Sequence, residues 1–173
     1  DIHIRPLGFV PNTLLCPHCG QYNNRPIQTD GILIYDKKLV MIRRQREYLS
    51  EIYADKYVQT FVKDTFNTGY MSGWYVLPGG YIRRSDTPEE TIIREFQEET
   101  GLKTKIKKIV GIYSDIDRDA KSNGISICYQ LEYVSGKIKS GLEVQEVNLV
   151  HLDSLPSPIA FDHKEMIEDF LAK

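Results

Sequence analysis

The chain contains few cysteines and no long apolar run. Its three cysteines, Cys16, Cys19 and Cys128, are odd in number and show no disulfide framework, which favours a reducing compartment. The longest apolar runs, at 31–35 and 39–42, fall far short of the roughly 20 residues that cross a bilayer. The N-terminus also lacks the apolar stretch of a secretory signal, so we expect a cytoplasmic protein with no membrane partner.

Excess charge of either sign is also scarce. The 173 residues include 22 Lys and Arg against 24 Asp and Glu, a formal net charge of −2. A non-specific nucleic-acid binder would carry a basic excess, so no nucleic-acid partner is expected. Hydrophobic residues at 41% and charged residues at 27% are ordinary for globular domains, which excludes disorder and low complexity.

Apolar periodicity and turn residues predict an α/β (α+β) fold class with a mixed sheet. Strands are expected at 32–35, 39–43, 74–77, 106–113, 125–134 and 147–152, and the first two form a hairpin. Helices are expected over about 48–66, over 88–100, and from Asp162, where Glu165 fits a capping box. Cys128, inside a strand, is interpreted as a small buried hydrophobe.

The helix over 88–100 has the clearest end signals. Thr87 suits the N-cap, Pro88 the first helical position, and Glu90 completes a Thr-x-x-Glu capping box. Gly101 supplies the C-terminal stop.

The same helix carries a cluster of acids. Glu95, Glu98 and Glu99 are spaced i, i+3, i+4 and therefore project from one face, where like charges repel. Divalent cations, which prefer oxygen ligands, would offset this repulsion. A merely solvated acidic face is the alternative, but it would not explain the glycine pair Gly79-Gly80 that precedes the helix.

Cys16 and Cys19 are separated by two residues on a turn, and they form half of a tetrahedral zinc knuckle. No second pair follows, so two interpretations stay open: a knuckle that binds Zn²⁺, or a vestigial one. Prolines break residues 1–28 throughout, and we expect an N-terminal extension there.

The stretch from Gly80 to Leu102 resembles the Nudix box, the signature of the Nudix hydrolases. Gly80 is followed after five residues by Asp86, and after seven more by the run Arg94-Glu-Phe-Gln-Glu-Glu-Thr-Gly-Leu. The one departure is Asp86, where the pattern has Glu. Because Asp is one methylene shorter, it either still pairs with Arg94 or loosens that contact.

The resemblance extends to most of the chain. Residues 113–119 and 160–163 resemble segments of Nudix members that cleave ADP-ribose or related nucleotides, and residues 16–30 resemble the tail of a zinc ribbon. The implied fold is a Nudix-type α/β/α sandwich over 29–173, with its catalytic helix at about 88–100 and a C-terminal helix. A helical insertion at about 48–72 is distinctive to this chain, and it suits either substrate specificity or a homodimer contact.

The resemblance also implies roles for the box residues. Glu95 and Glu99 would be the principal Mg²⁺ or Mn²⁺ ligands, assisted by Glu98 and by the Gly79 carbonyl. Arg94 would pair with a box carboxylate and orient it.

Candidates outside the box come from the chemistry. A carboxylate that completes deprotonation of the attacking water could be Glu143 or Glu146, and the alternative for each is an ordinary loop acid. Three basic side chains could reach substrate phosphates and one aromatic ring could stack on a base: Arg43, Arg44, Arg118 and Trp74. Strand alternation keeps the first two from both pointing inward, and the alternatives for the last two are ion pairing and core packing.

Three classes of function follow. The favoured one is divalent-cation-dependent hydrolysis of a nucleoside diphosphate derivative, ADP-ribose first, giving AMP and ribose 5-phosphate. A house-cleaning nucleoside triphosphate pyrophosphohydrolase is the alternative within that class. A non-catalytic nucleotide-sensing regulator would be expected to have lost its acids, and a zinc-ribbon module for nucleic acid or protein would need four ligands and a basic face.

Overall fold

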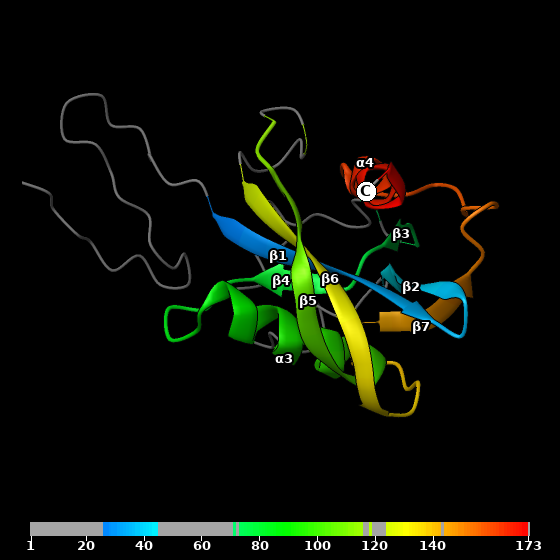
Figure 1. The fold of residues 1–173 in the computed structure, drawn as a ribbon, viewed down its shortest axis with the longest axis horizontal. Helices are drawn as coiled ribbons and strands as arrows, with labels where there is room; N and C mark the ends of the chain where they lie inside the picture. Colours follow the sequence, from blue (N-terminus) through cyan, green and yellow to red (C-terminus); the bar gives the residue numbers. More distant parts are fainter. Residues whose placement is uncertain are drawn as a thin grey trace, which may run out of the picture.

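A seven-stranded mixed sheet lies at the centre of the computed structural model, which describes residues 26–44, 71, 73–115, 118, 124–142 and 144–172 (Figure 1). Its strands and the two helices, in chain order, are β1 Ile27–Tyr35, β2 Lys38–Arg44, β3 Tyr75–Val76, β4 Gly79–Tyr81, α3 Pro88–Thr100, β5 Leu102–Tyr113, β6 Ile125–Gly136, β7 Val144–Val150 and α4 His163–Ala172.

Strand β1 is the hub of the sheet. The main order is β3-β2-β1-β6-β5, with β4 paired to β1 and β7 paired to β2. Along one edge β1 runs parallel to β6. Along the other it pairs with β4 through residues 28–30 and with β2 through residues 34–35. Among the described strands the pairings other than β1·β6 are antiparallel, so the sheet is mixed, as predicted.

The two helices cover opposite faces of this sheet (Figure 1). Alternation along β1 sends Ile32 to a core with Met166 and Ile167 of α4, and sends Leu33 to a core with Ile92 and Phe96 of α3. The result is the expected α/β/α sandwich. Cys128 is fully buried in the α4 core, as predicted.

The predicted start and stop of α3 are confirmed. The Thr87 side chain accepts from the Glu90 amide while the Glu90 carboxylate accepts from the Thr87 amide. Gly101 ends the helix in the left-handed region, at φ 75°. Side chains other than glycine rarely adopt that backbone conformation.

Several strand boundaries differ from the prediction. Strand β1 begins at Ile27 rather than at residue 32, because its pairing with β6 starts there, and β4 is a strand that was not predicted. Strand β5 begins at Leu102 rather than at residue 106, because buried Leu102 and Thr104 alternate with exposed lysines and pair with β6. Strand β7 covers Val144–Val150 rather than 147–152, since buried Val144 still pairs with Arg44 of β2.

Some expectations cannot be compared with the structure. The predicted helix over 48–66 and the Cys16–Cys19 pair lie outside the described residues. Neither described helix is long and apolar enough to cross a membrane.

Candidate active site

The acidic face of α3 packs directly against the backbone of β4. The Gly79 amide donates to Glu99 Oε2 at 2.8 Å. A Cβ on Gly80 would lie 2.8 Å from the Glu95 carboxyl carbon, so any other residue there would require the Glu95 side chain to shift. Fully buried Ile92 and Phe96, on the side of the helix that adjoins these acids, hold it on the sheet. The glycine pair and the carboxylates therefore form one rigid unit.

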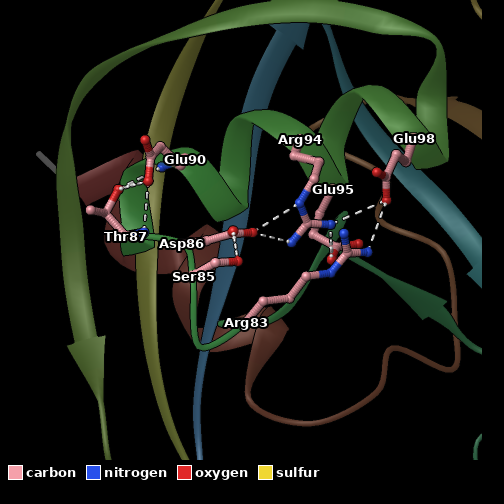
Figure 2. A network of polar contacts seen from close by, with 8 residues as sticks. All are labelled: Arg83, Ser85, Asp86, Thr87, Glu90, Arg94, Glu95 and Glu98. Atoms are coloured by element: carbon pink, nitrogen blue, oxygen red, sulfur yellow. Dashed lines mark hydrogen bonds and ion pairs between the residues drawn. The ribbon is translucent and has the colours of Figure 1, made fainter.

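Arg94 links three carboxylates in the centre of this unit (Figure 2). Its Nη1 lies 2.6 Å from Glu95 Oε1 and 3.2 Å from Glu98 Oε2. Its Nε and Nη2 lie 3.1 Å and 3.0 Å from Asp86 Oδ2. Arg83 adds a longer contact of 3.7 Å to Glu98. One planar guanidinium thus orients the helix acids and ties them to the preceding loop.

The question left open by Asp86 has a structural answer. The shorter side chain keeps its contact with Arg94. The Ser85 hydroxyl, which donates to Asp86 Oδ1 at 2.7 Å, together with the Arg94 guanidinium lowers the pKa of Asp86 below its ordinary value. Asp86 therefore stays ionised and serves as a counter-charge for Arg94.

Glu95 has the opposite electrostatic character. Burial raises its pKa above the ordinary value, and the nearby Glu98 adds to this, although the hydrogen bond from Arg94 opposes the shift. An ionised carboxylate that is held in a site unfavourable to its charge is a good partner for a cation.

Replacing Glu95 by Gln should stabilise the metal-free protein at neutral pH. Because the folded-state pKa lies above the ordinary 4.5, the folded chain binds the proton more tightly than the unfolded chain does. The stabilisation that Glu95 contributes is therefore full at pH values below its pKa in the unfolded chain. It is lost as the pH rises through the pKa of Glu95 in the folded chain. Thermal unfolding in a chelator should show a higher Tm for Glu95→Gln at about pH 7 and little change at about pH 4. A lower Tm at neutral pH would contradict the prediction.

The donor set of this face suits a hard divalent cation. Glu95, Glu98 and Glu99 supply carboxylate oxygens and Gly79 a carbonyl oxygen, which are the ligand types that Mg²⁺ and Mn²⁺ prefer. Within the described residues no three His, Cys, Asp or Glu side chains are already gathered as a metal cluster. The guanidinium of Arg94 instead neutralises two of these carboxylates.

A cavity of about 510 Å³ opens beside the acids. Arg83, Glu95, Glu98 and Glu99 line it together with residues 139–142. The latter segment is fastened to the end of α3, since its Lys139 and Gly141 amides donate to carbonyls of the last helical turn at 2.9 Å and 3.1 Å. A larger hollow of about 670 Å³ lies between the outer side of α3 and β5, but neither Glu95 nor Glu99 lines it. We therefore place the site in the smaller cavity.

A family model described as the NUDIX domain matches residues 26–170 of the chain. The chain belongs to the Nudix family. Similar proteins include an ADP-ribose pyrophosphatase of Methanocaldococcus jannaschii, which is 32% identical over 150 residues, 87% of this chain and 75% of that protein. With the box acids in place, the chain is a Nudix hydrolase of the pyrophosphatase type.

Solved structures support the Nudix fold. An ADP-ribose pyrophosphatase from Streptococcus suis superposes with a TM-score of 0.62 at 16% identity, covering 86% of this chain and 91% of that one. The Nudix domain of Shewanella oneidensis NrtR, solved with ADP ribose, superposes with a TM-score of 0.63 at 19% identity and covers 87% and 89%. At such identities the likeness establishes the fold alone.

Two predicted residues outside the Nudix box pair with each other. Arg43 Nη1 lies 3.3 Å from Glu146 Oε1, and the two are register partners on β2 and β7. By alternation they share the sheet face of Met41, which is the α4 side. Arg43 also donates to the Gly73 carbonyl at 2.9 Å. The structure therefore gives Glu146 a cationic partner on the face opposite α3.

The other substrate-binding candidates are scattered over the Nudix fold. For Arg118 the structure favours the ion-pairing alternative over contact with substrate. Its side chain is fully buried, and its Nε and Nη2 donate to the carboxylate of Asp162 at 2.8 Å. Arg44 lies over the Phe161 ring at 5.6 Å. Trp74 is partly exposed at 36% and remains a candidate for a base.

Sequence reasoning missed some residues that line the cavity, and one candidate cannot be placed. Glu143 lies outside the described residues, although its neighbours 139–142 line the cavity. Arg83, which lines the cavity, was missed. Its signal in the sequence is its position three residues before Asp86, close to the box acids. The glycine at 141 was the signal for the cavity segment, because a Cβ there would lie 2.2 Å from the Glu98 carbonyl oxygen.

Proposed function

We propose that this Nudix hydrolase cleaves the diphosphate linkage of ADP-ribose in a divalent-cation-dependent reaction that yields AMP and ribose 5-phosphate. The observation that carries the proposal is the unit of β4 glycines and α3 carboxylates beside an open cavity. The choice of ADP-ribose is supported by the similarity to the Methanocaldococcus jannaschii protein, which extends over 87% of this chain.

The α3 residues would divide the work of binding. Glu95 and Glu99, with Glu98 and the Gly79 carbonyl, would hold Mg²⁺ or Mn²⁺. The bound cation would neutralise the diphosphate and lower the pKa of the attacking water. Arg94 would keep the carboxylates oriented through the contacts it already makes. Glu143, which directly follows the cavity segment 139–142 in the chain, would accept the proton of that water; Glu146 is the weaker candidate, because it pairs with Arg43 on the face opposite α3.

Turnover of defined substrates tests the proposal. Purified protein should release AMP from ADP-ribose when Mg²⁺ or Mn²⁺ is present, and a chelator should stop the release. A parallel assay with nucleoside triphosphates, including 8-oxo-dGTP, should show a lower kcat/KM. No AMP from ADP-ribose with either cation would overturn the substrate, and a preference for a triphosphate would favour the house-cleaning alternative.

A further inference from the structure

His163, the first residue of α4, lies beneath the turn that leads into the glycine pair. Its side chain is buried, with the residue 2% exposed, and its Nδ1 accepts from the Leu77 amide at 2.9 Å. The two residues are separated by 86 positions in the chain, and α4 lies close to β3 in the fold (Figure 1). The C-terminal helix thus reaches the backbone just before Gly79.

This contact determines where the imidazole carries its proton. A ring nitrogen that accepts from a backbone N–H holds no proton of its own, so the proton of neutral His163 is on Nε2. That nitrogen lies 3.3 Å from Asp30 Oδ1, and Asp30 is 5% exposed. The Ser126 hydroxyl donates to the other oxygen of the same carboxylate. Asp30 is therefore placed to favour the tautomer that Leu77 needs.

The turn over residues 77–80 is fastened from three sides. From α4, His163 accepts the Leu77 amide. From β1, the Gly31 amide donates to the Pro78 carbonyl at 2.9 Å. From α3, Glu99 accepts the Gly79 amide at 2.8 Å. Only the first of these contacts uses a side chain whose hydrogen bonding depends on its tautomer.

The space around the turn leaves little room for adjustment. Gly79 is the register partner of Asp30, and a Cβ on Gly79 would lie 2.9 Å from the Asp30 Cα. A displacement of the Leu77 backbone therefore bears directly on the Gly79 amide that meets Glu99. Small displacements of supporting groups are enough to weaken ligand geometry.

We propose that His163, oriented by Asp30, is a positioning residue for the cation site: it holds the Leu77 amide so that Gly79 meets Glu99 and presents its carbonyl beside the carboxylates. The inference rests on the proposed function only in taking Gly79 and Glu99 as cation ligands. It assigns a role in the site to the C-terminal helix, which carries none of the box residues.

Two substitutions separate the two ring nitrogens. The side-chain oxygen of Asn takes approximately the place of Nδ1, so His163→Asn keeps an acceptor for Leu77 and loses the contact with Asp30. The longer Gln side chain carries its amide nitrogen near the place of Nε2, so His163→Gln leaves the buried Leu77 amide without its acceptor. Tyr113→Phe is the matched control, because it removes a different link to α4, the hydroxyl that donates to Asp169 Oδ2 at 3.0 Å.

Mn²⁺ binding without substrate, followed by electron paramagnetic resonance, is the main measurement. His163→Gln should weaken Mn²⁺ binding about tenfold, which is the smaller end of the affinity losses seen when a group that supports a metal ligand is removed. The Mn²⁺ affinities of His163→Asn and Tyr113→Phe should stay close to that of the wild type. Nitrogen-15 spectra of the wild-type imidazole should show the proton on Nε2. Exchange of the Leu77 amide should accelerate in His163→Gln and not in Tyr113→Phe.

Several results would overturn the inference. They are a wild-type ring protonated at Nδ1, no measurable Mn²⁺ binding, equal affinities in the His163→Gln and wild-type proteins, or an equal loss in Tyr113→Phe. If His163→Gln does not fold, a tenfold loss in His163→Asn would also overturn it, and near wild-type binding with the Nε2 proton would support it. The proposed function is tested independently of this inference. A protein that does not cleave ADP-ribose can still show the expected Mn²⁺ affinities, and a protein that cleaves ADP-ribose can show equal affinities in all variants.

Discussion

Replacing Glu99 by Gln should lower kcat for ADP-ribose by about a thousandfold, because a lost cation ligand removes several kcal/mol of charge stabilisation. The fold should remain, since the Gln side-chain oxygen can still accept from the Gly79 amide, which now donates to Glu99 at 2.8 Å. The shape of the side chain is kept and only its charge is lost. Steady-state kinetics with Mg²⁺, together with thermal unfolding, measure both halves of the prediction.

The matched control is Glu168→Gln on α4, which removes the same charge from an exposed i,i+4 pair with Lys164. Exposed pairs of this kind contribute little, so activity and Tm should stay near wild type. Activity of Glu99→Gln within a few-fold of this control, in well-folded protein, would remove Glu99 from the site.

Replacing Gly79 by Ala should destabilise the protein by roughly 3 kcal/mol, at the upper end of overpacking costs. The added Cβ would lie 2.0 Å from the Thr29 carbonyl oxygen and 2.9 Å from the Asp30 Cα, and both neighbours are backbone of β1. A buried strand in the centre of the sheet cannot move aside without breaking its ladder with β6. Denaturant unfolding gives the change in the free energy of unfolding.

Gly73→Ala distinguishes this clash from the general cost of losing a glycine. Gly73 has φ 74°, but the nearest atom to an added Cβ is the end of the flexible Arg43 side chain at 3.9 Å. The positive φ alone should then lower the free energy of unfolding of Gly73→Ala by about 1 kcal/mol. Equal losses for the two alanine variants would show that the β4 contact with β1 is looser than the structure indicates.

The parts of this protein that sequence reasoning predicted well are those decided by near neighbours. The capping box of Thr87 and Glu90 and the stop at Gly101 depend on contacts within four residues, and all three were found where predicted. The face shared by the α3 acids follows from helical geometry in the same way. The missed start of β5 was also local, since Leu102 and Thr104 alternate with lysines in the strand period.

The remaining features depend on partners that are distant in sequence. Arg43 meets Glu146 across 103 positions, and His163 meets Leu77 across 86. Arg118 was one candidate for substrate phosphates, with ion pairing as its alternative, and tertiary packing buries its side chain against Asp162, 44 positions away. Each side chain has several chemically reasonable partners, and only the tertiary fold decides which one it meets.

The bond from Leu77 to His163 has a consequence for the order in which the protein is made. Helix α4 follows all other described elements along the chain, so it leaves the ribosome after the acids of α3 and the glycines of β4. A nascent or truncated chain ending before α4 would carry every Nudix box residue, yet its Leu77 amide would lack the imidazole acceptor. Completion of the cation site would then wait for the synthesis of α4, and shortened products without α4 would be poor catalysts even when they fold.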